Sequence, residues 1–309
     1  MSKLPIDDLF EPRLTYPDFE PKERLARLVG LDDHKARLTK VLSLLIHPKG
    51  VRDWAAKHHP SASGLLSLVQ NRPPLVILAG DVGSGKTELA ETIGDAVARQ
   101  EGIDITLFPL SLSTRGQGRV GEMTQLISAA FDHAINEATS LKSAHGKARG
   151  GVILLIDEAD ALAQSREATQ MHHEDRAGVN AFIRGINRFG NGALPGAVIM
   201  CTNRLGALDP AIQRRAADIL TFERPTSLQR KIVLKNALQG TGFHEHDIDA
   251  LVVITGATKD RSYGYTFSDL IQRLLPAIVL DAYPNTGIHP KRALEIAKHI
   301  LPTAPFKDA

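Results

Sequence analysis

The sequence has little cysteine, no long apolar run and no excess of one charge, and each shortage excludes a class of protein. Cys201 is the single cysteine among 309 residues, so no disulfide can form within the chain, which fits a reducing compartment. No run approaches the ~18 apolar residues that a membrane-spanning helix needs, and the segment MSKLPIDDLFEPRL lacks the apolar core of a signal peptide. The 37 basic and 35 acidic residues give a net charge of +2, which excludes a strongly basic, histone-like chain. We therefore expect a soluble, cytoplasmic protein without a general affinity for membranes or nucleic acid.

Four short apolar runs predict the strands of a parallel sheet. The runs are Leu75–Ala79, Ile105–Leu110, Gly151–Ile156 and Ala197–Thr202. Each run is continuously apolar and does not alternate with polar residues, which is typical of strands that are covered on both faces. Helical patterns separate the runs, at Lys86–Gln100, Glu122–Ala138 and Asp175–Phe189. We therefore expect an α/β domain whose parallel strands are joined by crossover helices.

The two ends of the chain differ from this α/β pattern. Residues 1–21 contain four prolines and no sustained periodicity, which predicts an extended arm or a partly ordered tail. An amphipathic helix is expected at Leu31–His47. After Pro225 the strand signals largely stop, and helices are predicted at Leu228–Leu238, Asp247–Val253, Phe267–Ala282 and Lys291–Ile300. We expect an N-terminal arm over residues 1–27, a large α/β domain over 28–222 and a small helical domain over 223–309.

A phosphate-binding loop follows the first predicted strand. Residues 80–87 read GDVGSGKT, a full match to the pattern G-x-x-x-x-G-K-[ST], whose glycines let backbone N–H groups turn inward around phosphates. We expect Lys86 to reach the β- and γ-phosphates of ATP and the Thr87 hydroxyl to bind Mg²⁺. A glycine-rich turn that fits the pattern by chance is the alternative. The neighbouring residues expected at the nucleotide are Asp81, Val82, Gly83, Ser84, Gly85 and Glu88.

Two later strand ends supply the polar groups that hydrolysis needs. The apolar run at residues 152–156 ends in Asp157 and Glu158, and the run that ends at Thr202 is followed by Asn203. Asp157 is suited to hold Mg²⁺ through water, while Glu158 can polarise a water for in-line attack on the γ-phosphate. The Asn203 amide could position the same water. The alternative is that the two acids only cap the end of a strand.

Taken together, these motifs resemble those of an AAA+ ATPase. The resemblance rests on GDVGSGKTE, VILLIDEAD, MCTNR and LDPAIQRRA, and it covers residues 80 to 216. It implies a P-loop parallel-sheet domain with a small C-terminal helical lid. It also implies that Val29 and Gly30 lie against the adenine and that Asn203 is the sensor-1 residue.

The same resemblance implies catalytic arginines. The segment Asp209–Arg215 is similar to the region that carries the arginine finger, which in this family completes a neighbouring subunit's site within a ring, usually a hexamer. We favour Arg215 as the finger and keep Arg214 as the alternative; surface arginines at a helix end also fit. Where the lid helix should carry the sensor-2 arginine this chain has Leu270, and Arg273 comes nearly a turn later. Arg273 fits either a phosphate contact or an exposed helix residue.

Within the AAA+ proteins, the chain is similar to the pachytene-checkpoint type, which remodels HORMA-domain proteins. The similar segments are DRAGVNAFIRGINRF at 175–189 and LDPAIQRRAADILTFERPT at 208–226. Short bacterial members accompany cyclic-oligonucleotide antiphage systems, where they disassemble a HORMA protein bound to a nucleotide-synthesising enzyme. The resemblance therefore implies an ATP- and Mg²⁺-dependent remodeller that forms a homohexamer and acts on a HORMA-domain protein in antiviral defence.

Two polar loops depart from the pattern of ring translocases. The loop at Ser113–Val120 carries glycines, Arg115 and Arg119 where such proteins usually present an aromatic residue. It fits a pore loop that contacts substrate or an ordinary flexible loop, and the missing aromatic weighs against strong, processive threading. The adjacent His172 and His173 fit a polar pore-facing loop better than a metal site, because neighbouring positions on a regular element face apart.

Two other functions stay open at this point. A DNA-associated AAA+ ATPase, such as a helicase loader or transposition regulator, normally carries a basic stripe or an added DNA-binding module, and the charge of +2 argues against it. A nucleotide-gated scaffold without useful turnover is disfavoured because Glu158 and Asn203 are both present. A protein substrate is therefore the favoured hypothesis.

Overall fold

A computed structural model of the chain describes residues 10–61, 63–112, 122–142, 148–162, 173–191, 194–259 and 261–305. The chain forms two compact units, each built from segments that are separate in the sequence. Unit 1 comprises Met1–Arg27, Asp33–Ala79 and Thr87–Thr221, and unit 2 comprises Leu28–Asp32, Gly80–Lys86 and Phe222–Ala309. The division expected from the sequence did not assign residues 28–32 and the phosphate loop to the C-terminal unit.

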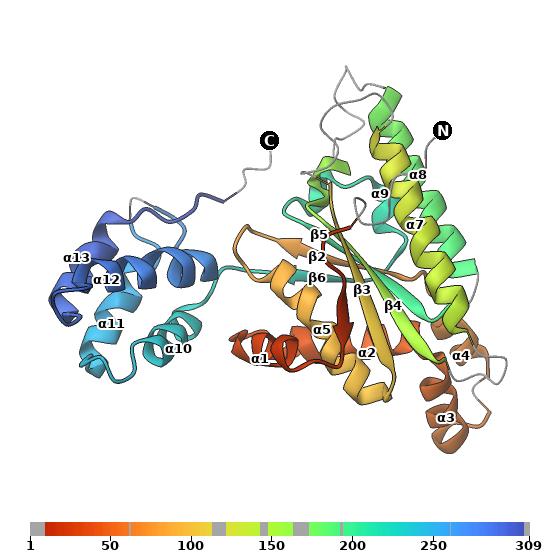
Figure 1. Ribbon diagram of the computed structural model, residues 1–309, viewed down its shortest axis with the longest axis horizontal. Helices are drawn as coiled ribbons and strands as arrows, with labels where there is room; N and C mark the ends of the chain where they lie inside the picture. The colour runs from red at the N-terminus through yellow and green to blue at the C-terminus, as the bar shows by residue number, and fades with distance from the viewer. Residues whose placement is uncertain are drawn as a thin grey trace. The chain divides into compact units, whose positions relative to one another are not determined.

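A six-stranded sheet with the order β1-β3-β4-β5-β2-β6 is the centre of unit 1 (Figure 1). The four predicted strands are confirmed as β2 (Leu75–Gly80), β3 (Asp104–Ser111), β4 (Gly150–Asp157) and β5 (Gly196–Thr202). The pairs β3–β4, β4–β5 and β5–β2 are parallel, so the carboxyl ends of β2, β4 and β5 meet at one edge of the sheet. Open α/β sheets bind their ligands at this edge.

Helices cover both faces of the sheet, which explains why the strands are apolar throughout. Helices α7 (Glu122–Leu141) and α8 (His173–Asn191) lie side by side on one face, where their apolar side chains share a core with alternate residues of the strands (Figure 1). Helix α2 (Asp32–Ile46) packs on the other face, where Gly151 has no side chain and so leaves room for Ile46. Helix α5 (Lys86–Glu101) follows β2 and the phosphate loop in the chain. The α/β class predicted from the sequence is confirmed.

The N-terminal region differs from the extended arm that the sequence predicted. Strand β1 (Leu14–Tyr16) adds antiparallel to β3, and helix α1 (Phe19–Arg27) follows it. The Tyr16 side chain is fully buried, and its hydroxyl donates a hydrogen bond to the Glu91 carbonyl of α5. A buried aromatic residue with a satisfied hydroxyl fixes this segment against the sheet, which proline content alone does not reveal.

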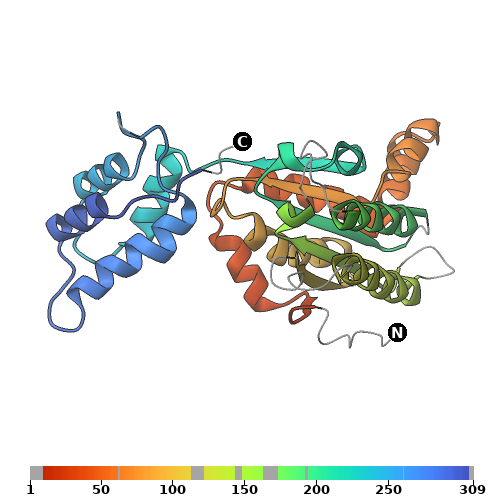
Figure 2. The ribbon, with the colours of Figure 1, turned by 90° about the horizontal axis from the view of Figure 1, so that it is seen from above.

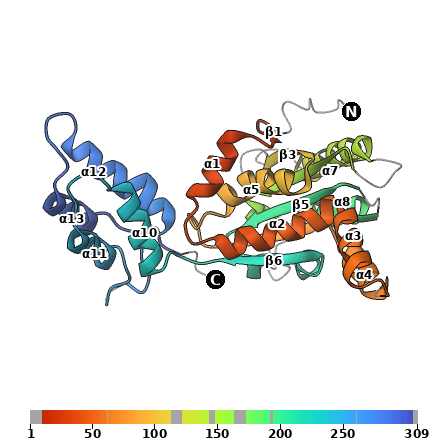
Figure 3. The same ribbon diagram turned by 90° about the horizontal axis from the view of Figure 1, so that it is seen from below.

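Several further elements had no clear signal in the sequence. Helices α3 (Pro48–His58) and α4 (Ser63–Gln70) project from the body of unit 1 (Figures 2 and 3). Strand β6 (Ala216–Phe222) lies beside β2 at the end of the sheet. The short turns η2 (Ala159–Leu162), η3 (Leu205–Ala207) and α9 (Pro210–Gln213) follow β4 and β5 at the edge where the strands end.

Unit 2 is helical after residue 226, as predicted. It contains α10 (Ser227–Ala237), α11 (Glu245–Ile254), η4 (Asp269–Leu274), α12 (Leu275–Ala282) and α13 (Pro290–His299) around a separate apolar core. The single helix expected over 267–282 is divided, because η4 is a wider π-helical stretch in which the Leu275 N–H reaches back to the Leu270 carbonyl. Pro276 is the physical cause, since its ring removes an N–H donor and clashes with the carbonyl four residues earlier.

Among the described residues, no helix combines the length and the apolar character that crossing a membrane requires.

Candidate functional site

The phosphate loop closes around its own lysine. The Lys86 ammonium group donates hydrogen bonds of 2.8 Å to the carbonyls of Gly80 and Asp81, and the Ser84 hydroxyl donates to the Asp81 carbonyl at 2.7 Å. Gly83 and Gly85 have φ values of +71° and +97°, a conformation that costs side-chain-bearing residues energy. Val82, beside Gly83, is exposed and its N–H binds the Asp81 carboxylate. The glycines of the motif are therefore required by the backbone.

Within unit 2, this loop packs against segments far along the chain. The Gly83 carbonyl accepts a hydrogen bond from the Ser268 N–H at 3.2 Å. The Asp81 carboxylate binds Arg224, which follows β6. The Gly30 carbonyl accepts from the Gln229 amide at 3.1 Å, and Val29 packs against the core of unit 2. The expected adenine-binding segment and the phosphate loop thus belong to the same unit.

Glu158 stands in a strained conformation at the end of β4. Its φ is +52°, and it has the only positive φ among the described residues other than glycine. A left-handed conformation costs an ordinary residue about 1–2 kcal/mol, and such strain is concentrated at functional sites. The Glu158 N–H donates to the carboxylate of Asp157 at 2.8 Å, and the Glu158 side chain is exposed. The backbone thus turns sharply between the two acids.

Asp160 joins the end of β4 to the end of β5, a role that its place in the sequence motif does not indicate. Its carboxylate accepts hydrogen bonds from the Thr202 hydroxyl at 2.7 Å and from the Asn203 side-chain amide at 2.9 Å. It also accepts from the backbone N–H groups of Asn203 and Arg204, both at 3.1 Å. Asp160 belongs to the motif VILLIDEAD, but only the structure shows what it binds. Asp160 therefore fixes the orientation of the predicted sensor-1 residue.

Glu88 is paired with a cation of unit 1. Thr87 and Glu88 lie in the first turn of α5, where the Glu88 carboxylate accepts hydrogen bonds of 2.8 and 2.9 Å from Arg24 of α1. The same guanidinium donates to Glu91 at 2.6 Å. Burial raises the pKa of Glu91, and the hydrogen bond from Arg24 offsets this only in part. Hydrogen bonding to Glu88 raises the pKa of Arg24. The structure gives Glu88 a partner that the motif did not reveal.

The two candidate finger arginines have different surroundings. Arg215 donates from Nε to the Asn187 side chain at 3.1 Å and from Nη1 to the Ala211 carbonyl at 2.8 Å. Arg214, at the C-terminal end of α9, is exposed, and its guanidinium binds no other residue in the described part of the chain. Arg215 is thus bound to its own unit, while the Arg214 side chain is exposed.

Arg273, the candidate sensor-2 residue, pairs with Asp269 at 2.9 Å. Burial would raise the pKa of Asp269, but hydrogen bonds from Thr266, Thr303 and Arg273 outweigh it and lower the pKa. The predicted pore loop at residues 113–120, with Arg115 and Arg119, lies outside the described residues, as does His172. His173 is the first residue of α8.

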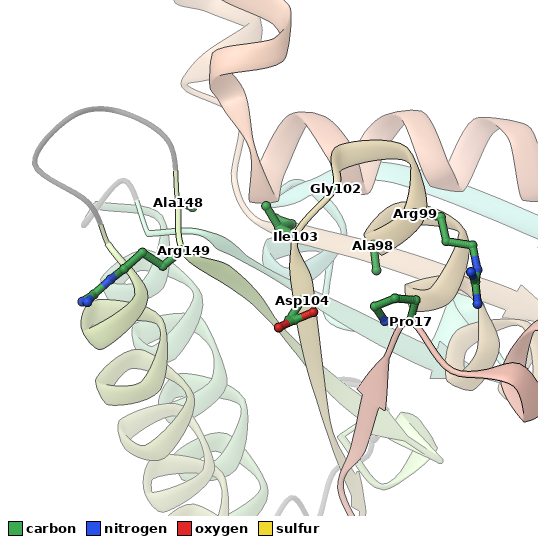
Figure 4. A pocket seen from close by; sticks show the side chains of 8 residues that line it. All are labelled: Pro17, Ala98, Arg99, Gly102, Ile103, Asp104, Ala148 and Arg149. Atoms are coloured by element: carbon green, nitrogen blue, oxygen red, sulfur yellow. The ribbon is translucent and has the colours of Figure 1, made fainter.

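A cavity of about 540 Å³ in unit 1 lies away from these strand ends. It is formed at the start of β3, where Asp104 lies between Pro17 and Arg149 (Figure 4). The Arg99 and Arg149 side chains point outward on opposite sides of the hollow. Because β3 and β4 are parallel, their amino ends lie at the edge opposite to Asp157. This cavity is therefore not part of the candidate site.

Comparisons with known proteins agree with the fold. Residues 76–224 match the family model described as ATPase family associated with various cellular activities (AAA). CD-NTase-associated protein 6 of Escherichia coli (strain MS 115-1) is 64% identical over 303 residues, which cover 98% of this chain and 97% of the relative. A chain in the structure of the E. coli MS115-1 HORMA:CdnC:Trip13 complex is 61% identical with a TM-score of 0.90, over 99% of this chain and 100% of that one. The structure of Rhizobiales Trip13 is 57% identical with a TM-score of 0.73, over 96% of this chain and 100% of that one. The strands, the loop and the similarity along nearly the whole length lead to one conclusion: this chain belongs to the AAA ATPase family, in the group of CD-NTase-associated protein 6.

Proposed function

We propose that this chain is an ATP-hydrolysing ring subunit that opens or disassembles a HORMA-domain protein. The observation that carries the proposal is the similarity over 99% of the chain to the protein found in the HORMA:CdnC:Trip13 complex. The name of the 64% identical relative, CD-NTase-associated protein 6, supports the same setting. The chain then acts beside a nucleotide-synthesising enzyme in antiphage defence, and its immediate substrate is the HORMA partner.

The residues present fit ATP and Mg²⁺. The glycines at positive φ let the loop backbone approach phosphates, and Lys86 already lies within the loop. Thr87, in the first turn of α5, and Asp157, at the end of β4, offer the oxygen ligands that Mg²⁺ prefers. Held by these two residues, the ion would stabilise the negative charge that develops on the phosphates. In this proposal Lys86 orients the terminal phosphates.

Glu158 acts as the base that orients the attacking water. Its exposed carboxylate follows directly after Asp157, and the left-handed backbone directs the chain away from the strand at this point. Asn203 holds the water from the neighbouring strand end, with its own amide fixed by Asp160. Positioning of this kind is the main contribution that a protein makes to phosphoryl transfer.

We assign the arginine finger to Arg214 rather than to Arg215, which the sequence alone favoured. A finger that acts on a neighbouring subunit must be accessible in its own subunit, and Arg214 is exposed while Arg215 is bound to Asn187 and Ala211. Arg215 then supports the turn that presents Arg214. A homohexameric ring supplies the neighbour that this arrangement requires.

Replacing Glu158 with Gln tests the hydrolytic part of the proposal. The amide keeps the size of the side chain but cannot act as a base, so we expect turnover to fall by about 100-fold or more while ATP binding persists. Steady-state phosphate release and equilibrium ATP binding measure the two effects separately. Unchanged turnover would show that Glu158 is not the base.

The same variant tests the partner. A subunit that binds ATP without hydrolysing it should stay on its substrate, so tagged Glu158→Gln protein with ATP is expected to retain a HORMA-domain protein that it releases with ADP. The Lys86→Ala variant is the control, because it should not bind ATP and should retain nothing. Equal recovery of the HORMA protein with both variants would contradict the remodelling proposal.

A further inference from the structure

Asp81 places a negative charge in a loop that must accept phosphates. ATP carries about four negative charges, and a carboxylate within the loop repels them unless a cation compensates it. Asp81 is largely buried, with its side chain 15% exposed, so water screens it little. Its Oδ1 already accepts the neighbouring Val82 N–H.

Arg224 is the cation that faces Asp81. Its Nε donates to Asp81 Oδ2 at 2.6 Å, and its Nη2 lies 2.5 Å from the same oxygen. Its Nη1 donates to the Gly264 carbonyl at 2.7 Å, and the guanidinium lies 4.9 Å from the centre of the Tyr263 ring. The Arg224 side chain is also 15% exposed. These contacts hold the guanidinium in one orientation against the loop.

We infer that Arg224 is a positioning residue for nucleotide binding, which acts by neutralising Asp81 and holding the phosphate loop in its receptive shape. The inference rests on the proposed ATP site but adds a residue that lies 138 positions beyond Lys86 in the chain. In this proposal Arg224 acts through the Asp81 carboxylate and not by direct contact with a phosphate. Removal of the Arg224 charge alone leaves the buried Asp81 carboxylate uncompensated. Removal of both charges leaves no uncompensated carboxylate in the loop.

Equilibrium binding of ATP, ADP and adenosine to the full chain tests the inference, with Arg224→Gln, Asp81→Asn and the double variant. We expect Arg224→Gln to raise the Kd for ATP by about tenfold, the Kd for ADP by less, and the Kd for adenosine by about twofold at most. The double variant should bind ATP more tightly than Arg224→Gln alone. The effect of Arg224→Gln should also increase with the charge of the ligand. A loss of folding would instead weaken the binding of all three ligands alike.

Arg261→Gln is the matched control. Arg261 also lies near the Tyr263 ring, at 5.9 Å, and binds the carbonyls of Tyr263 and Gly256, but it has no carboxylate partner in the loop. This variant removes the same charge from the same region, so its effect on ATP binding should be much smaller than that of Arg224→Gln. Arg224→Lys keeps the charge and should lie close to the wild type even if the Gln variant folds poorly.

Four results overturn the inference. The first two are an unchanged ATP Kd in Arg224→Gln and a double variant that binds ATP no more tightly than that single variant. The other two are a loss of adenosine binding as large as the loss of ATP binding and an Arg224→Lys variant as weak as Arg224→Gln. If the wild-type chain binds no ATP, the proposed function itself fails, which this set of measurements shows separately.

Discussion

At the scale of single residues, Asp160 organises the turn after β5. Its two oxygens accept hydrogen bonds from a hydroxyl, a side-chain amide and two backbone N–H groups of three consecutive residues, Thr202, Asn203 and Arg204. Hydrogen bonds to a charged acceptor are about twice as strong as neutral ones. The side-chain amide of Asn203 is thereby held in one orientation, which its proposed role in positioning a water requires.

Replacing Asp160 with Ala should therefore impair turnover far more than ATP binding. We expect kcat to fall by about tenfold or more and the Kd for ATP to change by less than about threefold, because the phosphate loop is untouched. Asp160→Asn keeps one acceptor oxygen, so its kcat should lie between those of the wild type and Asp160→Ala. Steady-state kinetics and equilibrium binding give the two constants.

Asp132 provides a matched control for that experiment. It forms an ion pair with Arg188, but both side chains are more than half exposed, so Asp132→Ala should leave both constants close to those of the wild type. If Asp160→Ala weakened ATP binding as much as turnover, Asp160 would be a general structural support and would not position Asn203.

The sequence predicted those residues of the candidate site that belong to short local motifs. Lys86, Thr87, Asp157 and Glu158 each follow from a strand end and a fixed spacing. The partners of these residues could not be predicted in the same way, because Arg24 and Arg224 meet the motif only through the folded chain. Arg214 and Arg215 also differ in exposure. Because they are adjacent residues of the same type, the sequence alone does not indicate which of them is exposed.

At the scale of elements, Arg24 fastens α1 to the first two turns of α5. The guanidinium binds Glu88 and Glu91 together, and Glu91 is the more buried of the two acids. A carboxyl whose pKa is raised in the folded state destabilises the fold once it ionises. This cost is absent at pH values below its ordinary pKa and appears as the pH rises through the raised pKa. Arg24 reduces the cost at neutral pH.

Arg24→Ala should consequently destabilise the protein by about 1–3 kcal/mol at pH 8. The loss should become smaller as the pH falls through the pKa of Glu91, because the protonated carboxyl no longer needs a cation. Urea denaturation at several pH values measures the difference. The control is Arg292→Ala, since Arg292 also bridges two carboxylates, Asp281 and Glu295, but on an exposed surface. A loss independent of pH would contradict the role given to Glu91.

The elements themselves were predictable where the apolar pattern was long. Strands β2 to β5 are continuous apolar runs, and their positions follow from burial on both faces. Strand β1 has three residues and a proline directly after it, too short for any periodicity to be visible. The π-helical stretch before α12 also escaped prediction, because a proline inside a helical pattern allows a kink, a break or a widened turn.

At the scale of the whole molecule, a ring with a trans-acting Arg214 makes a prediction about mixed subunits. Arg214→Ala and Glu158→Gln should each be inactive alone. Coexpressed, they should recover up to about a quarter of wild-type turnover, because a site that combines Glu158 of one subunit with Arg214 of its neighbour is complete. ATPase activity of the purified mixture is the measurement.

The control pairs Glu158→Gln with Lys86→Ala. Both residues must come from the same subunit to complete one site, so this mixture should stay inactive. Recovery in the first mixture alone supports the assignment of Arg214. No recovery in either mixture, with both variants present in the same oligomers, would show that Arg214 does not act across a subunit boundary.

The discontinuity of unit 2 limits how this chain can be divided. The phosphate loop lies in the first third of the sequence, yet its supporting residues come from beyond position 222, through Arg224 and Ser268. A fragment cut at the apparent boundary after Thr221 would retain the whole motif and lose its scaffold. Recombination between relatives faces the same constraint. A crossover at that boundary combines the phosphate loop of one parent with the supporting residues of the other. The loop and its supporting residues must therefore come from the same parent for the loop to function.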